Sequence, residues 1–458
     1  MTRVLRLGLK TTAAGCAAAL VLSPAAWAIG PPAVDPATPP PAGSAGAAVP
    51  MQQQGDCITT GVLPGFDPAV ASQNQRMLNL DGAWRFSRGE GQTVAVIDTG
   101  VKPGPRLPNV EPGGDYVGDS DGLTDCDGHG TLVAGLIGGQ PGDDAFSGVA
   151  PAARILSIRQ ASARYSPRTT GGDPVLEHAK VDIDSLARAV VRAADLGARV
   201  INISSATCLP AGADVDQTAL GAALRYAAVD KDAVIVASAG NAGPNGIAGG
   251  QACQSNPVGG ATNPEDPRNW AAVGAVSTPS WWQPHVLSVG SLTPGGQPSK
   301  FTMSGPWVGI AAPGESVVSV SNGDGLANAV PTERGQLGAI SGTSFAAAYV
   351  SGVAALVRSR FPEMPANHVI QRLTRTAHNG ARDPSNLVGA GTLDPVAALT
   401  WELPPPPGEL PATQIAAPVA APPQNHTPRN IAFAGTAALA VAVAAAAFAV
   451  NRRKERSQ

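Results

Sequence analysis

The stretch Val94-Ala-Val-Ile-Asp98-Thr-Gly100 decides the fold of this chain, because it places an acid directly after a short, continuous apolar run. Such a run is typical of a strand that is buried on both faces of a parallel sheet. Asp98 is therefore expected at the carboxyl end of a strand, where parallel sheets carry their functional side chains. Taken alone, an aspartate in such a turn is as often a capping residue as a catalytic one.

Two further stretches, Gly128-His129-Gly130-Thr131 and Gly342-Thr343-Ser344, supply an imidazole and a hydroxyl. A histidine presented between glycines can act as a general base. Ser344 opens a helix predicted for residues 344–361, so its backbone N–H and the positive helix terminus face a developing oxyanion. The alternative is an ordinary N-cap serine. In the order Asp98, His129, Ser344, the three stretches predict a Ser-His-Asp triad and a serine hydrolase.

An oxyanion hole needs a second donor, and Asn241 is the candidate. It lies in Ala237-Ser-Ala-Gly-Asn241, directly after an apolar run, so we expect its side-chain amide at the same edge of the sheet. Residues 154–158, 200–203 and 234–237 repeat the buried-strand pattern, and residues 183–196 carry a helical apolar stripe. This alternation predicts an α/β fold with a mainly parallel sheet covered by helices on both faces.

The other acids and histidines that we considered are assigned no catalytic or metal-binding role. Asp119, Asp121, Asp125 and Asp127 precede His129 without a regular ligand spacing, so we interpret them as solvated loop charge rather than a calcium site. No metal or cofactor is expected. Five further histidines are interpreted as ordinary surface or core residues: His178, His285, His368, His378 and His426.

The composition and the N-terminal residues indicate which partners and which cellular location to expect. The 458 residues carry a net charge of -3, which gives no reason to expect a nucleic-acid partner. Residues 1–28 resemble a signal peptide, with Arg3, Arg6 and Lys10 before a short apolar run and cleavage expected after Ala28. The alternative, a retained anchor, is disfavoured because the run is too short to span a bilayer.

Residues 431–450 form an uncharged stretch of the length that a membrane-spanning helix needs. A soluble alanine-rich helix is disfavoured because no polar face recurs. The basic tail at residues 451–458, which includes Arg452 and Lys454, predicts a cytoplasmic end and an extracytoplasmic body on the periplasmic side. Residues 401–430 form a proline-rich linker, and about 28 residues in polyproline II at ~3.1 Å per residue could hold the body up to ~85 Å from the membrane.

Four cysteines follow the predicted signal peptide, and an even number in an exported chain predicts disulfides. Cys57, Cys126, Cys208 and Cys253 allow three pairings, and none shows the Cys-x-x-Cys spacing of a zinc site. The body is expected over residues 81–400, preceded by an extension over residues 29–80.

Over residues 81–399 these motifs resemble the subtilases, the subtilisin-like serine proteases. The resemblance implies a three-layer αβα body, a triad of Asp98, His129 and Ser344, and Asn241 in the oxyanion hole. With the signal peptide, extension, cysteines, linker and terminal span, the whole chain resembles the mycosins, the membrane-bound subtilases of actinobacterial type VII secretion systems. That likeness suggests the paralogue of the metal-homeostasis system.

The mycosin resemblance implies the pairs Cys57–Cys126 and Cys208–Cys253, protein or peptide substrates, and a type VII membrane complex as partner. It also implies that the extension stays attached and wraps the body. Two functions remain open: a selective endopeptidase of exported substrates, and a structural scaffold of the secretion machinery with dispensable protease activity.

Departures from the common subtilase pattern limit what can be carried over. Phe345 and Ala348 replace the usual methionine and proline, and residues 201–208 lack the usual Leu-Gly-Gly edge, so peptide specificity cannot be inferred. Residues 161–180 and 243–282 are interpreted as insertions, which serve either partner contacts near the groove or no particular function.

Overall fold

The computed structural model describes residues 29–168, 171–243, 253–258, 263, 265–332, 335–380, 385–404 and 427–455. It divides into two compact units, Met1–Pro404 and Pro405–Gln458. The predicted signal peptide, residues 405–426 of the predicted linker and residues 456–458 of the tail lie outside the described residues. The predicted domain boundaries themselves stay predictions.

A seven-stranded sheet with strand order β11-β10-β8-β6-β2-β4-β3 forms the centre of the first unit, and all its pairings are parallel. Its strands are β2 (Thr93–Asp98), β3 (Val110–Asp115), β4 (Arg154–Arg159), β6 (Val200–Ile203), β8 (Val234–Ser238), β10 (Val286–Leu292) and β11 (Val308–Pro313). The four strands predicted from apolar runs are confirmed as β2, β4, β6 and β8. Because all strands run the same way, their carboxyl ends share one edge.

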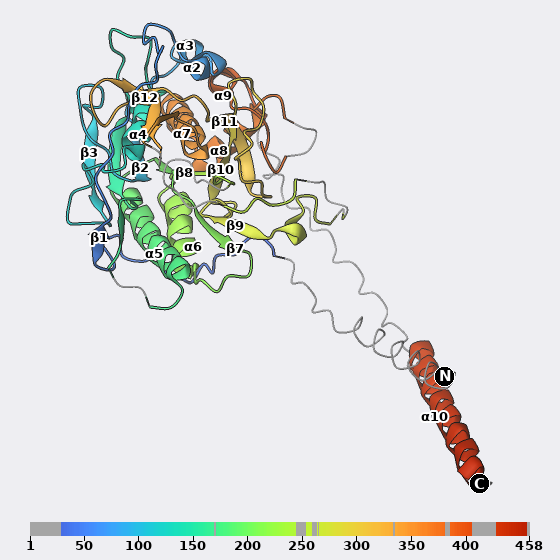
Figure 1. Cartoon of the computed structure of the whole chain (residues 1–458). Coiled ribbons are helices and arrows are strands. Elements are labelled where there is room, and N and C mark those ends of the chain that lie inside the picture. Colours follow the sequence, from blue (N-terminus) through green and yellow to red (C-terminus); the bar gives the residue numbers. More distant parts are fainter. Residues whose placement is uncertain are drawn as a thin grey trace. The chain divides into compact units, whose positions relative to one another are not determined.

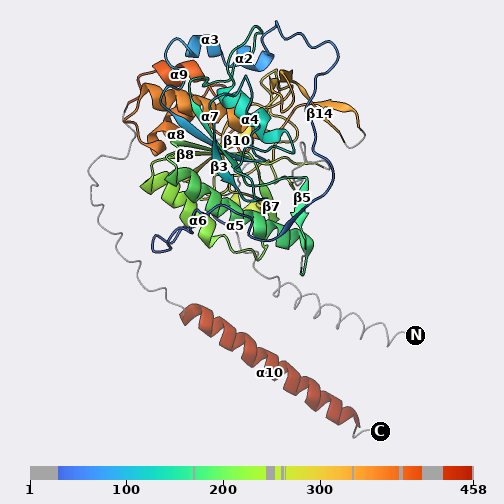
Figure 2. The same cartoon turned by 90° about the vertical axis from the view of Figure 1, so that its left-hand side faces the viewer.

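Helices cover both faces of this sheet, and the body therefore has the predicted three layers (Figures 1 and 2). In the described part of the first unit, the helices and helical turns are α2 (Gln73–Met77), α3 (Leu80–Ala83), α4 (His129–Gly138), α5 (Pro174–Asp195), α6 (Thr218–Arg225), the π-helical η1 (Tyr226–Asp230), the 3-10 turn η3 (Trp270–Ala272), α7 (Thr343–Arg360), α8 (Ala366–Arg375) and α9 (Pro395–Thr400). The helix predicted for residues 344–361 is α7, shifted by one residue.

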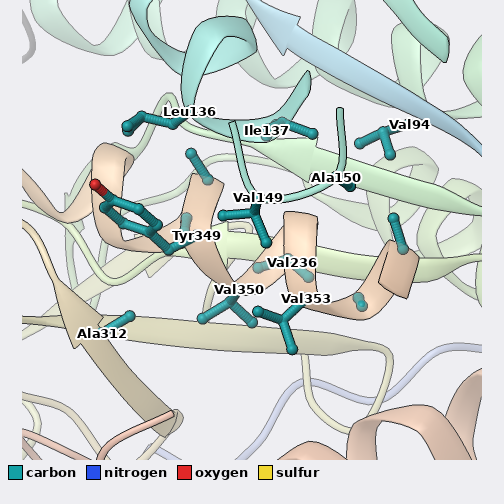
Figure 3. Close-up of a cluster of buried hydrophobic side chains, with 14 of the residues drawn as sticks. Val94, Leu136, Ile137, Val149, Ala150, Val236, Ala312, Tyr349, Val350 and Val353 are labelled. Atoms are coloured by element: carbon teal, nitrogen blue, oxygen red, sulfur yellow. The ribbon is translucent and has the colours of Figure 1, made fainter. Parts of the chain in front are cut away.

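Alternate residues of β2 face two different cores. Val94 and Val96 pack with α4 and α7, whereas Ala95 and Ile97 pack with α5 and α6 on the opposite face. This alternation is the period of two that a strand imposes on its side chains. Figure 3 shows part of the first core, in which Tyr349, Val350 and Val353 of α7 are drawn together with Leu136 and Ile137 of α4 and with Val94, Val236 and Ala312 of the sheet. Burial on both faces explains why the predicted strands are continuous apolar runs.

Among the described residues, four two-stranded antiparallel sheets lie outside the central sheet. They pair β1 (Met51–Gln53) with β5 (Tyr165–Pro167), β7 (Thr207–Pro210) with β9 (Ala275–Thr278), β12 (Ser319–Val320) with β13 (Leu326–Ala327), and β14 (Ala329–Pro331) with β15 (Leu337–Ala339). The pairing of β1 with β5 joins the N-terminal extension to the body.

The two stretches interpreted as insertions carry more regular structure than their composition suggested. Residues 161–180 contain β5 and the beginning of α5, which starts at Pro174, nine residues before the predicted helix. Asp173 caps this helix through a 2.9 Å hydrogen bond from the Val175 N–H. The apolar stripe begins late because most residues in the first turns of α5 are exposed or half-buried, with Ala179 as a buried exception.

The second unit contains the helix α10 (Thr427–Glu455). Its segment Phe433–Val450 has a mean hydropathy of 2.2, and by length and composition it is suited to cross a membrane. This segment covers most of the predicted span at residues 431–450.

Candidate active site

Asp98 ends β2 and is fully buried. Its Oδ1 atom lies 2.7 Å from Nδ1 of His129, the first residue of α4, and also accepts a 2.7 Å hydrogen bond from the Thr99 N–H. Because a carboxylate only accepts hydrogen bonds, this contact places a proton on Nδ1 of the imidazole. Nε2 is then the nitrogen that can accept a proton.

The close approach of α4 to the end of β2 depends on Gly130. A Cβ atom at this position would lie 2.0 Å from the carbonyl oxygen of Gly100. Any side chain here would push the start of α4 away from the turn after β2, and with it the imidazole of His129. The small residue after the histidine is therefore explained by packing.

Asp125 organises the loop before α4. Its carboxylate accepts hydrogen bonds of 2.6–3.2 Å from the Thr99 hydroxyl, the N–H groups of Asp127 and Gly128, and the N–H and hydroxyl of Thr131. Burial nevertheless raises the pKa of Asp125 to about 6. This network joins the turn after β2 to the first turn of α4, and so helps to position His129.

The interpretation of the acidic loop as solvated charge is wrong for two of its four members. Asp119 and Asp121 are exposed, but Asp125 and Asp127 are only 8% and 6% exposed. Asp127 accepts hydrogen bonds from the Ser162 hydroxyl and the Ala163 N–H. Donors from a neighbouring loop replace water, which makes burial of the carboxylate tolerable. Among the described residues, no group of His, Cys, Asp and Glu is arranged to hold a metal ion.

Several opposing effects act on the charge of His129. Burial lowers the pKa of the imidazole, but the charges of Asp98, Asp125 and Asp127 and the hydrogen bond to Asp98 outweigh it. The pKa of His129 is therefore raised above its ordinary value, because the surrounding carboxylates stabilise the imidazolium. An imidazole in this environment takes up a proton readily.

Ser344 lies in the first turn of α7, at the same edge of the sheet as His129. Its hydroxyl donates a 3.1 Å hydrogen bond to the carbonyl oxygen of Ser204, which follows β6. The ring of the next residue, Phe345, lies 5.2 Å from the imidazole of His129 between centroids. The first turn of α7 is thus packed against the histidine.

Asn241 follows β8, and Thr343 controls its orientation. The Oδ1 atom of Asn241 accepts hydrogen bonds of 3.0 Å from both the N–H and the hydroxyl of Thr343. Since both contacts use the oxygen, the NH2 group of the amide points away from Thr343. Asn241, His129 and Ser344 all line one cleft of about 530 Å³. The structure therefore brings all four predicted site residues to one place.

The rest of the cleft wall comes from several parts of the chain, among them residues 116–117 after β3 and residues 160–163 after β4. Residues 204–207 follow β6, the N-terminal half of α5 lies beyond them, and Met51 and Gln54 come from the extension. The extension is joined to the loop before His129 by the disulfide Cys57–Cys126. It also donates a 3.0 Å hydrogen bond from the Thr60 N–H to Asn322. The second disulfide is Cys208–Cys253, so both pairs are those implied by the resemblance.

Sequence reasoning did not find the residues that hold the four candidates in place: Thr99, Asp125, Ser204 and Thr343. Asp125 and Thr99 could have been suspected, because short polar side chains beside glycine-rich turns commonly hydrogen-bond to the local backbone. Ser204 acts through its carbonyl oxygen, which every residue possesses, so no side-chain pattern marks it.

The fold, with this cleft at the carboxyl edge of its sheet, is that of a subtilisin-like serine protease, and comparisons with known proteins agree. Residues 89–391 match the model of the subtilase family. Mycosin-3 of Mycobacterium tuberculosis (strain ATCC 25618 / H37Rv) is 63% identical over 450 residues, which cover 96% of this chain and 97% of that protein.

Two solved structures are also similar. One is the MycP3 protease from the type VII (ESX-3) secretion system, with 65% identity, a TM-score of 0.78, and coverage of 82% of this chain and all of the other. The other is a chain of an intact ESX-5 inner membrane complex, with 47% identity, a TM-score of 0.79, and coverage of 92% and 99%. The chain belongs to the subtilase family and, within it, to the mycosins. It is a serine endopeptidase.

Proposed function

We propose that Ser344 is the nucleophile of this endopeptidase, His129 its general base and Asp98 the residue that orients His129. The observation that carries this proposal is the 2.7 Å contact of Asp98 with His129, at the wall of a cleft that Ser344 and Asn241 also line. Asn241, through its NH2 group, and the Ser344 N–H stabilise the oxyanion.

The reaction follows from these positions. Ser344 leaves its hydrogen bond to Ser204, gives its proton to Nε2 of His129 and attacks the peptide carbonyl carbon. The tetrahedral oxyanion collapses to an acyl-enzyme as His129 returns the proton to the leaving amine. Water then attacks the acyl-enzyme by the same route and regenerates the serine hydroxyl. The carboxylates that raise the pKa of His129 stabilise the imidazolium formed in both stages.

An active-site label tests these roles. A peptidyl phosphonate that reacts with activated serines should modify the full-length protein in detergent at one site, and Ser344→Ala should abolish the modification. Ser359→Ala, on the same helix, is the matched control and should leave labelling intact. Absence of labelling of the wild-type chain, or labelling that persists in Ser344→Ala, would refute the assignment.

We also propose that α10 anchors the chain with the body outside the cytoplasmic membrane and residues 451–458 inside. The support is the apolar segment Phe433–Val450 followed by the basic tail. In intact cells, a membrane-impermeant maleimide should label a Ser457→Cys variant only after the membrane is permeabilised. Labelling without permeabilisation would place the tail outside and reverse the orientation.

We propose the type of secretion system that this chain serves from its sequence identity to two solved structures. The chain is 65% identical to the ESX-3 protease structure and 47% identical to the chain of the ESX-5 complex, which favours an ESX-3-type system. That the secretion system served by this chain acts in metal homeostasis stays a prediction.

The extension is proposed to remain attached after export, because a disulfide and the pairing of β1 with β5 both hold it to the body.

A scaffold role is the second candidate, favoured by the match to a chain within an intact ESX-5 inner membrane complex. Secretion by three strains separates the candidates: wild type, a deletion of this chain, and Ser344→Ala. Secretion that persists with Ser344→Ala but fails in the deletion makes the scaffold role primary. Equal failure in both makes proteolysis primary.

A further inference from the structure

The cleft extends from Ser344 to the N-terminal half of α5, where Asp182 and His178 belong to its lining. The carboxylate of Asp182 accepts no hydrogen bond from the described residues. Its nearest partner is Nε2 of His178, at 3.6 Å, which is longer than a hydrogen bond. The Asp182 side chain is 29% exposed, so a ligand in the cleft can reach it.

Gln160, which follows β4, also lines the cleft, and its Nε2 supports the backbone at Asp182. Its Nε2 donates to the carbonyl oxygen of Asp182 at 3.1 Å and to the Ser185 hydroxyl at 2.9 Å. Because a carbonyl oxygen only accepts, this contact fixes the orientation of the amide. Oε1 is left buried without a hydrogen-bond partner, on a residue that is 4% exposed. The ligand-accessible acceptor at this place is therefore the carboxylate of Asp182, which Gln160 helps to position.

The charged side chains that line the described part of the cleft are carboxylates and imidazoles, while the guanidinium of Arg159 lies over the ring of the lining residue Tyr165 and pairs with Asp115. Asp127 adds a carboxylate near His129, and the described residues that line the cleft include neither lysine nor arginine. Burial raises the pKa of Asp182 to about 6, although the nearby imidazole of His178 acts to lower it. A ligand group that suits these surroundings is positively charged and carries several N–H donors.

We propose that Asp182 and Gln160, with His178 beside them, form a specificity subsite for an arginine side chain of the bound peptide, which we call the α5 subsite. The guanidinium group, with its planar fork of N–H donors, donates to the exposed Asp182 carboxylate, while Gln160 holds the backbone at Asp182 through its Nε2. A lysine would bind less well, because its single ammonium is a point charge rather than a fork. This inference rests on the proposed function, in which the cleft binds peptides.

The test compares arginine with citrulline, which has the same shape but no charge. Full-length protein carrying Ser344→Ala, in detergent, is titrated with octapeptide mixtures in which one position in turn holds either residue. At one position, arginine should bind about 10- to 100-fold tighter than citrulline, as expected for hydrogen bonds between charged groups. Asp182→Asn in this background should bring the ratio close to one.

Asp184→Asn is the matched control, because Asp184 lies on the same helix with a side chain 55% exposed and paired with Arg188. It should leave the arginine preference unchanged. A ratio near one at every position of the parent protein would overturn the proposal, and so would equal losses in Asp182→Asn and Asp184→Asn. Since Ser344→Ala has no nucleophile, the binding result does not depend on the triad. Failed phosphonate labelling would remove the proposed catalytic roles and leave charge-selective binding standing.

Discussion

Thr343 orients the amide of Asn241, and replacing it by valine isolates this effect. Thr343→Val keeps the shape of a fully buried side chain and removes only the hydroxyl hydrogen bond to Oδ1 of Asn241, while the backbone N–H bond of 3.0 Å remains. A hydrogen bond of this kind contributes about 1 kcal/mol, which corresponds to about a fivefold loss in rate. The ceiling is the loss of the whole donor, which in subtilisin costs about 10²–10³ in turnover.

The assay is the second-order rate of phosphonate labelling, because the labelled serine carries a phosphoryl oxygen in the position of the oxyanion. A double-mutant cycle with Asn241→Ala decides the mechanism. If Thr343 acts through Asn241, Thr343→Val slows labelling in the parent protein but not in the Asn241→Ala background. Thr343→Ser, which keeps the hydroxyl, should restore the rate.

Equal slowing by Thr343→Val in both backgrounds would refute this reasoning, because the hydroxyl would then act independently of the amide. No slowing in either background would show that the backbone N–H alone orients Asn241.

Two further outcomes follow from the packing and charge of the body. Gly352→Ala should lower the free energy of unfolding by about 1–3 kcal/mol, because its Cβ would lie 2.5 Å from Cβ of Val149. Thermal unfolding measures this loss. The control Gly104→Ala should be nearly neutral, because the space around Gly104 is open. Labelling by the phosphonate should fall as the pH drops through the raised pKa of His129, because the base must be neutral to accept a proton. Asp127→Asn removes a carboxylate that raises this pKa, so it should move the midpoint of the pH profile to lower pH.

Much of the core architecture was predictable because it depends on local sequence. Buried parallel strands need continuous apolar runs, and four such runs predicted β2, β4, β6 and β8. The beginning of α5 was missed although Asp173 and Pro174 are typical of a helix N-terminus. Its first turns line a cleft instead of a core, so they lack the apolar stripe that predicted the rest of the helix.

Sequence by itself determined the class of protein and the four candidate site residues, because Asp98, His129, Asn241 and Ser344 each stand directly beside a strand or helix end in a recognisable setting. Only the tertiary structure decided which side chains are desolvated. Asp125 and Asp182 look like ordinary acids in the sequence, but one is buried among donors and the other faces a cleft without one. Burial and unmet hydrogen bonds arise between segments far apart in the chain, so no local pattern records them.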